Sequence, residues 1–123
     1  MPLGWKRMTA YNRGDVVLVN FPYTDNSRII SRPALVIQDE TINTGFNQWI
    51  VVQITSNTSR TGITRIPVAK TSTAGRSMRI LSDSVIVADK IATLDEREIK
   101  KPIGSCPLML QVDQALKTIL KLL

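Results

Sequence analysis

Short apolar, β-branched runs alternate with polar segments along most of the 123-residue chain. Runs of about four to eight such residues, bounded by Gly, Pro, Asn, Asp and Ser, are typical of β-strands. The pattern predicts five to seven short strands and a loop at 70–77. The candidate strands span residues 14–21, 32–38, 48–56, 63–69, 78–81, 84–88 and 91–94. The last two are expected to form one strand with a kink at 89–90, and Pro67 favours a sheet edge for 63–69 because proline donates no backbone hydrogen bond.

The end of the chain has the period of a helix instead. Apolar side chains recur there at helical spacing, at Val112, Leu116, Ile119 and Leu123. Pro107 suits the first helical position, with Ser105 or Cys106 as the N-cap. Several short strands and one helix in a chain of this length predict a single, mainly β domain, folded as a small barrel or a strongly bent sheet.

The charge of the chain suggests a polyanionic partner. Lys and Arg outnumber Asp and Glu by 16 to 10, which gives a formal net charge of +6. A basic surface favours nucleic acid, although the cations are scattered and a merely solvated basic surface is the alternative. The single cysteine, Cys106, cannot form an intramolecular disulfide, which fits a reducing cytoplasm. Without histidine or a close carboxylate cluster we expect no metal site and no cofactor, and no apolar run is long enough to span a membrane.

Polar residues at the ends of two apolar strands are the leading candidates for an active site. Arg32 opens the most apolar run of the chain, and the run at 48–56 ends in Thr55 and Ser56. A guanidinium can hold two phosphate oxygens, although a surface ion pair is an equally ordinary use for it. A hydroxyl can bind a phosphate or relay a proton, although Thr and Ser also cap turns. Gln53 is expected on the same strand face as Thr55 because side chains alternate along a strand.

Four segments in order resemble the MazF/PemK family of toxins from bacterial toxin–antitoxin pairs. They are G-D-V-V-L-V-N-F-P-Y-T-D with R-P-A-L-V-I after a loop, V-V-Q-I-T-S, S-V-I-V-A-D-K-I-A-T-L-D, and I-G-S-C-P before the helix. The resemblance covers residues 13–123 and leaves 1–12 as an N-terminal extension. It implies an SH3-like barrel with a C-terminal helix, the fold shared by MazF and CcdB toxins, and usually a homodimer.

The resemblance also implies an activity. Members of the family cut single-stranded RNA, often mRNA, at specific sequences and without a metal, leaving a 2′,3′-cyclic phosphate and a 5′-hydroxyl. A MazE-like antitoxin covers the site, and the toxin–antitoxin complex binds DNA. Two alternatives stay open: a non-nucleolytic, gyrase-poisoning toxin like CcdB, and a basic SH3-like nucleic-acid-binding module.

The family motifs assign roles to individual residues. Arg32, Thr55 and Ser56 match catalytic positions. Many relatives carry a glutamate in an S-E-Q-x-G-x-R-P stretch, where this chain reads T-D-N-S-R-I-I-S-R-P. Asp25 is the candidate replacement, and a turn-forming Asp is the alternative. Asp89 matches a position used at the site or the dimer interface of some relatives, and the general acid and base stay open.

RNA contacts are expected mainly from loops. The candidate phosphate contacts are Arg28, Arg60, Arg65, Lys70, Arg76 and Arg79. Gln53 is a candidate to read a base edge or orient the phosphate. Aromatic side chains that can stack on bases are Phe21, Tyr23, Phe46 and Trp49. Phe21 and Trp49 lie at strand positions more typical of a core, which leaves Tyr23 as the better stacking candidate.

Overall fold

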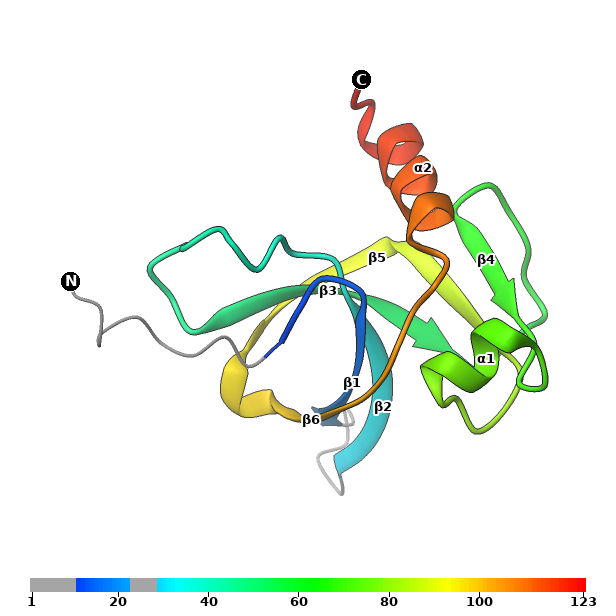
Figure 1. Ribbon diagram of the computed structural model, residues 1–123, viewed down its shortest axis with the longest axis horizontal. Coiled ribbons are helices and arrows are strands. Elements are labelled where there is room, and N and C mark those ends of the chain that lie inside the picture. The colour runs from blue at the N-terminus through cyan, green and yellow to red at the C-terminus, as the bar shows by residue number, and fades with distance from the viewer. Residues whose placement is uncertain (1–10, 23–28) are drawn as a thin grey trace.

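One antiparallel sheet with two helices makes up the computed structural model, which describes residues 11–22 and 29–123 (Figure 1). The elements in chain order are β1 Asp15–Pro22, β2 Ile29–Val36, β3 Gln48–Thr55, β4 Arg65–Val68, α1 Thr73–Met78, β5 Ser84–Asp95, the 3-10 turn η1 Glu96–Glu98, β6 Ile99–Ser105 and α2 Met109–Leu120. The six strands follow the order β4-β5-β3-β2-β1-β6, which confirms the mainly β class and the C-terminal helix. β4, with its Pro67, lies at an edge as the sequence predicted.

Because the sheet bends strongly, it buries apolar side chains on both faces. One cluster joins Val16, Leu35 and Ile54 to the buried face of α2, where Val112 and Leu116 lie. A second cluster forms on the opposite face, as alternation along each strand requires, from Val17, Val19, Ala34, Val36, Trp49, Val51, Ile99 and Tyr11. The Tyr11 and Trp49 rings meet edge to face at 5.5 Å, so the packed unit begins no later than Tyr11. Together the two clusters contain most of the apolar residues of the predicted strands.

The pairing of β2 with β3 stops halfway along both strands. Their last pair is Ala34 with Gln53. Beyond it β2 stays paired with β1 as far as Ile29, and β3 stays paired with β5 as far as Thr55. The two strands therefore part at this point, and the residues next to the parting lose a neighbour on one side.

A bulge in β5 lies opposite Gln53, the residue of β3 at which the pairing with β2 ends. Val52 pairs with Ile91, but the next residue, Gln53, pairs with Val87, so residues 88–90 are extra on β5. A bulge bends its strand and turns side chains out of the ladder. The predicted kink at 89–90 is confirmed, and its physical form is this bulge.

A short helix, α1, occupies the segment that the sequence analysis expected to be a loop and then a strand. Ser72 begins it as the N-cap, with its hydroxyl accepting a hydrogen bond from the Gly75 N–H at 2.9 Å. Arg79 ends it in the left-handed conformation, with φ 59°. The predictions of a loop at 70–77 and a strand at 78–81 were wrong because six residues are too few to show a helical period.

The close approach of α1 to β6 depends on a glycine. A Cβ on Gly104 would lie 2.6 Å from the backbone oxygens of Ser77 and Met78. A hydrogen bond from the Ser77 hydroxyl to the Ser105 carbonyl at 2.9 Å joins the same two elements. The strand β6 itself had no sequence prediction, because Lys100, Lys101 and Pro102 interrupt its apolar pattern.

The C-terminal helix starts later than expected. Its N-cap is Leu108, without a side-chain cap, so Ser105 and Cys106 do not cap it and Pro107 precedes it. Val112 and Leu116 are buried as predicted, whereas Ile119 and Leu123 are exposed. Arg13 ties α2 to the sheet: it forms an ion pair with Asp113 at 2.5 Å and donates to the Ile37 carbonyl at 2.8 Å. Within the described ranges no helix is long and apolar enough to cross a membrane.

We predict that Gly104→Ala lowers the free energy of unfolding by about 1–3 kcal/mol, because the added methyl overlaps two backbone oxygens that cannot rotate away. Urea denaturation measures the change. Gly62→Ala is the matched control, since nothing lies within 4 Å of a Cβ there, and should stay within about 0.5 kcal/mol of the parent protein. Equal stabilities for the two variants would contradict the close packing of α1 on β6.

Candidate active site

Arg32 lies on β2 just beyond the point where β2 and β3 part. Its side chain is half-buried and shares a sheet face with Ala34, which belongs to the second apolar cluster. If the register of β2 and β3 continued for two more residues, Arg32 would lie across from Thr55. Arg32 therefore lies at the edge of the second apolar cluster, where no strand is paired with the β3 side of β2.

A pocket of about 520 Å³ opens on this face beside the bulge of β5, and we call it the bulge pocket. Its lining consists of Arg32, Ala34, Val51, Gln53, Asp89, Lys90, Ile91 and Ala92. Gln53 reaches it because its side chain alternates with the buried Val52 and Ile54. Asp89 and Lys90 reach it because the bulge removes them from the ladder. The structure thus brings together Arg32, Gln53 and Asp89, three residues that the sequence singled out separately.

The two predicted hydroxyls are placed differently. Thr55 shares the face of Gln53, and its Oγ1 accepts a hydrogen bond from the Asn57 N–H at 3.1 Å. That contact is the turn-capping role that the sequence left as the alternative, although the hydroxyl proton stays available to a ligand. Ser56 is exposed and lines a different pocket, again together with Arg32. Arg32 is the residue that the two pockets share.

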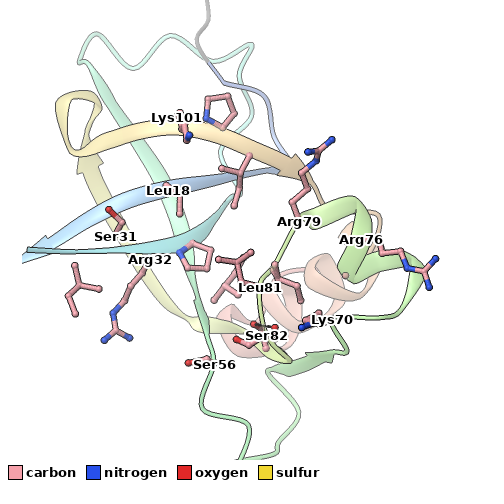
Figure 2. A pocket seen from close by; sticks show the side chains of 18 residues that line it. Leu18, Ser31, Arg32, Ser56, Lys70, Arg76, Arg79, Leu81, Ser82 and Lys101 are labelled. Carbon is pink, nitrogen blue, oxygen red and sulfur yellow. Dashed lines mark hydrogen bonds between the residues drawn. The ribbon is translucent and has the colours of Figure 1, made fainter.

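That second pocket, of about 910 Å³, lies between the end of β2 and α1, and we call it the α1 pocket. Among the 18 residues that line it, the cations are Arg32, Lys70, Arg76, Arg79 and Lys101. Figure 2 shows Arg32 on the β2 side, Arg76, Arg79 and Lys70 on the opposite side, and Lys101 on β6 along the top of the view. The floor is aliphatic, with Leu18, Pro33 and Ile54 among its residues.

The α1 pocket has one sign of charge. No Asp or Glu is among its lining residues. In the described part of the chain, ion pairs within 4.0 Å join Arg13 to Asp113 and Arg97 to Asp95, and none involves a cation of the pocket. Cationic side chains without a paired carboxylate attract anions into a concave site. In the bulge pocket, by contrast, Asp89 supplies one carboxylate beside Arg32 and Lys90.

Several residues that the sequence predicted for the site line neither pocket or lie outside the described residues. Asp25, Tyr23 and Arg28 lie outside the described residues. Arg60 is exposed in the loop before β4 and lines neither pocket. Arg65 also lines neither, but it pairs with Val87, the residue that pairs with Gln53 on the other side. Arg65 and Gln53 therefore face the same way across one strand.

Two of the aromatic residues predicted to stack on bases, Trp49 and Phe46, lie in different environments. Trp49 is buried and donates from Nε1 to the Glu96 Oε1 at 3.2 Å, so its core interpretation is confirmed. Phe46 is exposed, but it precedes β3 at the end of the strand opposite to Thr55. Neither ring lines the two pockets that contain Arg32.

Two lysines of the pockets, Lys90 and Lys101, were missed by the sequence analysis. Lys90 was noted only as part of a kink, and Lys101 lies on β6, a strand that was not predicted. Lys101 pairs with Leu18 of β1, and both line the α1 pocket. Their positive charge was the available signal, but it did not distinguish them from the other scattered cations.

The single cysteine of the chain lines neither pocket. Cys106 is buried in the first apolar cluster, and burial raises the pKa of its thiol. A raised thiol pKa lowers the fraction of reactive thiolate at neutral pH. In the described part of the chain, no three His, Cys, Asp or Glu side chains gather as metal ligands. Catalysis without a metal stays a prediction.

A bent antiparallel sheet with a C-terminal helix and an arginine at the parting of two strands agrees with the comparisons with known proteins. Residues 12–120 match the family of PemK-like, MazF-like toxins of type II toxin–antitoxin systems. The endoribonuclease MazF of Staphylococcus epidermidis is 32% identical over 108 residues, which cover 85% of this chain and 86% of that protein. The chain therefore belongs to the PemK-like, MazF-like toxin family.

Solved structures agree with this assignment. A mycobacterial endoribonuclease in complex with its cognate antitoxin has a TM-score of 0.69 and 26% identity, covering 93% of this chain and 98% of that one. A MazE–MazF complex from Deinococcus radiodurans has a TM-score of 0.71 at 21% identity, covering the same shares of the two chains. The second likeness supports the fold alone, and together they confirm the predicted MazF-type fold.

Proposed function

We propose that the protein is the toxin of a type II toxin–antitoxin system and an endoribonuclease that cuts single-stranded RNA at specific sequences. The family membership and the relatives named as endoribonucleases support this activity. The observation that carries the chemistry is the position of Arg32, at the meeting of two pockets and beside Gln53 and Asp89. The gyrase-poisoning and binding-module alternatives have no comparable support in the site.

The proposed reaction uses the RNA's own 2′-hydroxyl as the nucleophile. Its oxygen attacks the adjacent phosphorus and loses its proton, the bond from phosphorus to the 5′-oxygen breaks, and that oxygen takes up a proton. The products are a 2′,3′-cyclic phosphate and a 5′-hydroxyl. The protein has to stabilise the charge on the non-bridging oxygens and assist both proton transfers.

We assign these tasks to a few residues of the two pockets. Arg32 stabilises the charge of the five-coordinate phosphorus, because its planar fork can donate to two oxygens at once and stays protonated. Gln53, in the same pocket, orients the phosphate or a neighbouring base. Asp89 is the carboxylate of that pocket and the candidate proton acceptor. The Ser56 hydroxyl lines the α1 pocket with Arg32 and can donate to a phosphate oxygen. Thr55, which shares the strand face of Gln53, is the second candidate donor.

Partners follow from the same family assignment. Two of the similar structures are complexes with an antitoxin, and we propose a MazE-like antitoxin for this chain. A homodimer is also proposed, since the end of α2 exposes Ile119, Leu120, Leu122 and Leu123, and contiguous apolar surface is typical of protein interfaces. A cytoplasmic location is proposed from the single buried cysteine and the RNA substrate.

We predict that Arg32→Ala lowers kcat/KM for RNA cleavage by about 10²–10³, the loss typical of removing one donor to a developing oxyanion. Arg32→Lys keeps the charge without the fork and should retain more activity than Arg32→Ala. Cleavage of a labelled RNA gives the rates, and circular dichroism checks the fold. Arg97→Ala is the control, since Arg97 is exposed, forms an ion pair with Asp95 and lines neither pocket. Undiminished cleavage by Arg32→Ala would refute the assigned role.

A second prediction concerns the nucleophile. An RNA with a single 2′-deoxy substitution at the nucleotide 5′ to the cut should not be cleaved there, because the attacking oxygen is missing. Cleavage of the unmodified RNA should persist in excess EDTA and leave a 2′,3′-cyclic phosphate, which mass spectrometry detects. A 3′-hydroxyl product, or cleavage at the deoxy position, would show that water is the nucleophile instead.

A further inference from the structure

Arg79 adopts a backbone conformation that glycine would occupy at lower cost. It ends α1 with φ 59° and ψ 37°, and its N–H bonds to the carbonyls of Gly75 and Arg76. Helices that end in this left-handed conformation usually have glycine there, because a Cβ is strained at positive φ. Lys121 ends α2 in the same conformation, so the backbone alone assigns no role, and what distinguishes Arg79 is its place in the lining of the α1 pocket.

The side chain of Arg79 lines the α1 pocket, across from Arg32 (Figure 2). Lys101 lines the pocket from β6, and Gly104 two pairs further along that strand lets α1 pack against it. The backbones that carry Arg79 and Lys101 are therefore fixed relative to each other. The two side chains are exposed, so the packing fixes where each begins and leaves the charged groups able to reach a ligand. A concave, carboxylate-free lining with these cations favours anionic groups.

Arg32 connects this pocket to the site of cleavage. It lines both the bulge pocket, with Gln53 and Asp89, and the α1 pocket, with Arg79 and Lys101. The two pockets open on opposite faces of β2 and β3, with Ala34 and Gln53 in one and Pro33 and Ile54 in the other, and they meet at Arg32, where the strands part. A strand of RNA whose scissile phosphate lies at Arg32 would pass this parting to enter the α1 pocket. Its next phosphates would meet the cations of that pocket.

We propose that the α1 pocket is a second RNA-binding subsite, which holds the backbone phosphates of nucleotides flanking the cleavage sequence through Arg79 and Lys101. The proposal rests on the proposed function. An acidic peptide would also match the charge. RNA is favoured because Arg32, the assigned phosphate ligand, is part of the same lining. The subsite adds affinity without base recognition, since phosphate contacts carry no sequence information.

The test compares two double variants that lose the same charge and relieve the same backbone strain. Arg79→Gly with Lys101→Gln removes the two cations of the pocket. Lys121→Gly with Lys117→Gln is the matched control, because Lys121 ends α2 in the same left-handed conformation, with φ 55°, and both lysines lie outside the two pockets. Both variants should fold, with a Tm no lower than that of the parent chain if the glycine relieves strain.

The readout is binding of a fluorescent RNA that carries the mapped cleavage sequence, long flanks and a 2′-deoxy nucleotide at the cut. The pocket variant should raise Kd about tenfold near 0.15 M salt, and reduce the slope of log Kd against log salt by about 1.4, because each single-strand phosphate contact contributes about 0.7. The control variant should match the parent protein in Kd once size-exclusion chromatography has shown the same oligomeric state for both, because Lys121 lies among the exposed apolar residues at the end of α2.

Trimming the RNA locates the contact. Removing the flank on one side of the cleavage sequence should bring the Kd values of the pocket variant and the parent protein together, whereas trimming the other side should not. Equal Kd values for the pocket and control variants on long RNA would overturn the proposal, as would a loss that neither trimming changes. If the pocket variant bound RNA as the parent protein does but was inhibited less by the antitoxin, the pocket would be an antitoxin-binding site. That result would also overturn the proposal. A parent protein that cuts no RNA would instead refute the proposed function.

Discussion

The parting of β2 and β3 is the constraint on which the site depends. In an uninterrupted sheet, the ladder between the two strands would leave no opening beside Arg32. Because pairing stops at Ala34 and Gln53, each strand keeps one neighbour and the sheet bends around the gap. The bulge of β5 lies beside this gap, because it removes Asp89 from the ladder opposite Gln53. Polar side chains thus meet at the rim of two apolar clusters whose packing fixes their positions.

The other wall of the site depends on steric fit. α1 has only six residues, too few for a stable isolated helix, so its stability has to come from packing. Gly104 allows its last turn to approach β6 within a distance that any side chain would prevent. The same contact brings Arg79, at the end of α1, and Lys101, on β6, into the lining of one pocket. A local packing requirement therefore determines where two cations of the surface lie.

The sequence predicted those parts of the fold whose apolar period extends over many residues. The runs that became β1, β2 and β3 and the kink at 89–90 were evident, and Arg32 stood out as a cation beside an apolar strand. The helix α1 is too short for a period, and Pro102 and two lysines hide β6. The significance of Arg79 was also out of reach, because its left-handed backbone depends on where α1 ends. Propensity could not reveal features that tertiary contacts create.

Arg32 is proposed to contact a non-bridging oxygen of the scissile phosphate, and sulfur substitution at that phosphate tests the contact. An RNA is prepared with one non-bridging oxygen of that phosphate replaced by sulfur, as each of the two diastereomers. The parent protein should cut one diastereomer more slowly, because sulfur accepts hydrogen bonds from a guanidinium poorly. Arg32→Ala should lose this preference and cut both at a similar, low rate. The same preference in Arg32→Ala as in the parent protein would contradict the contact.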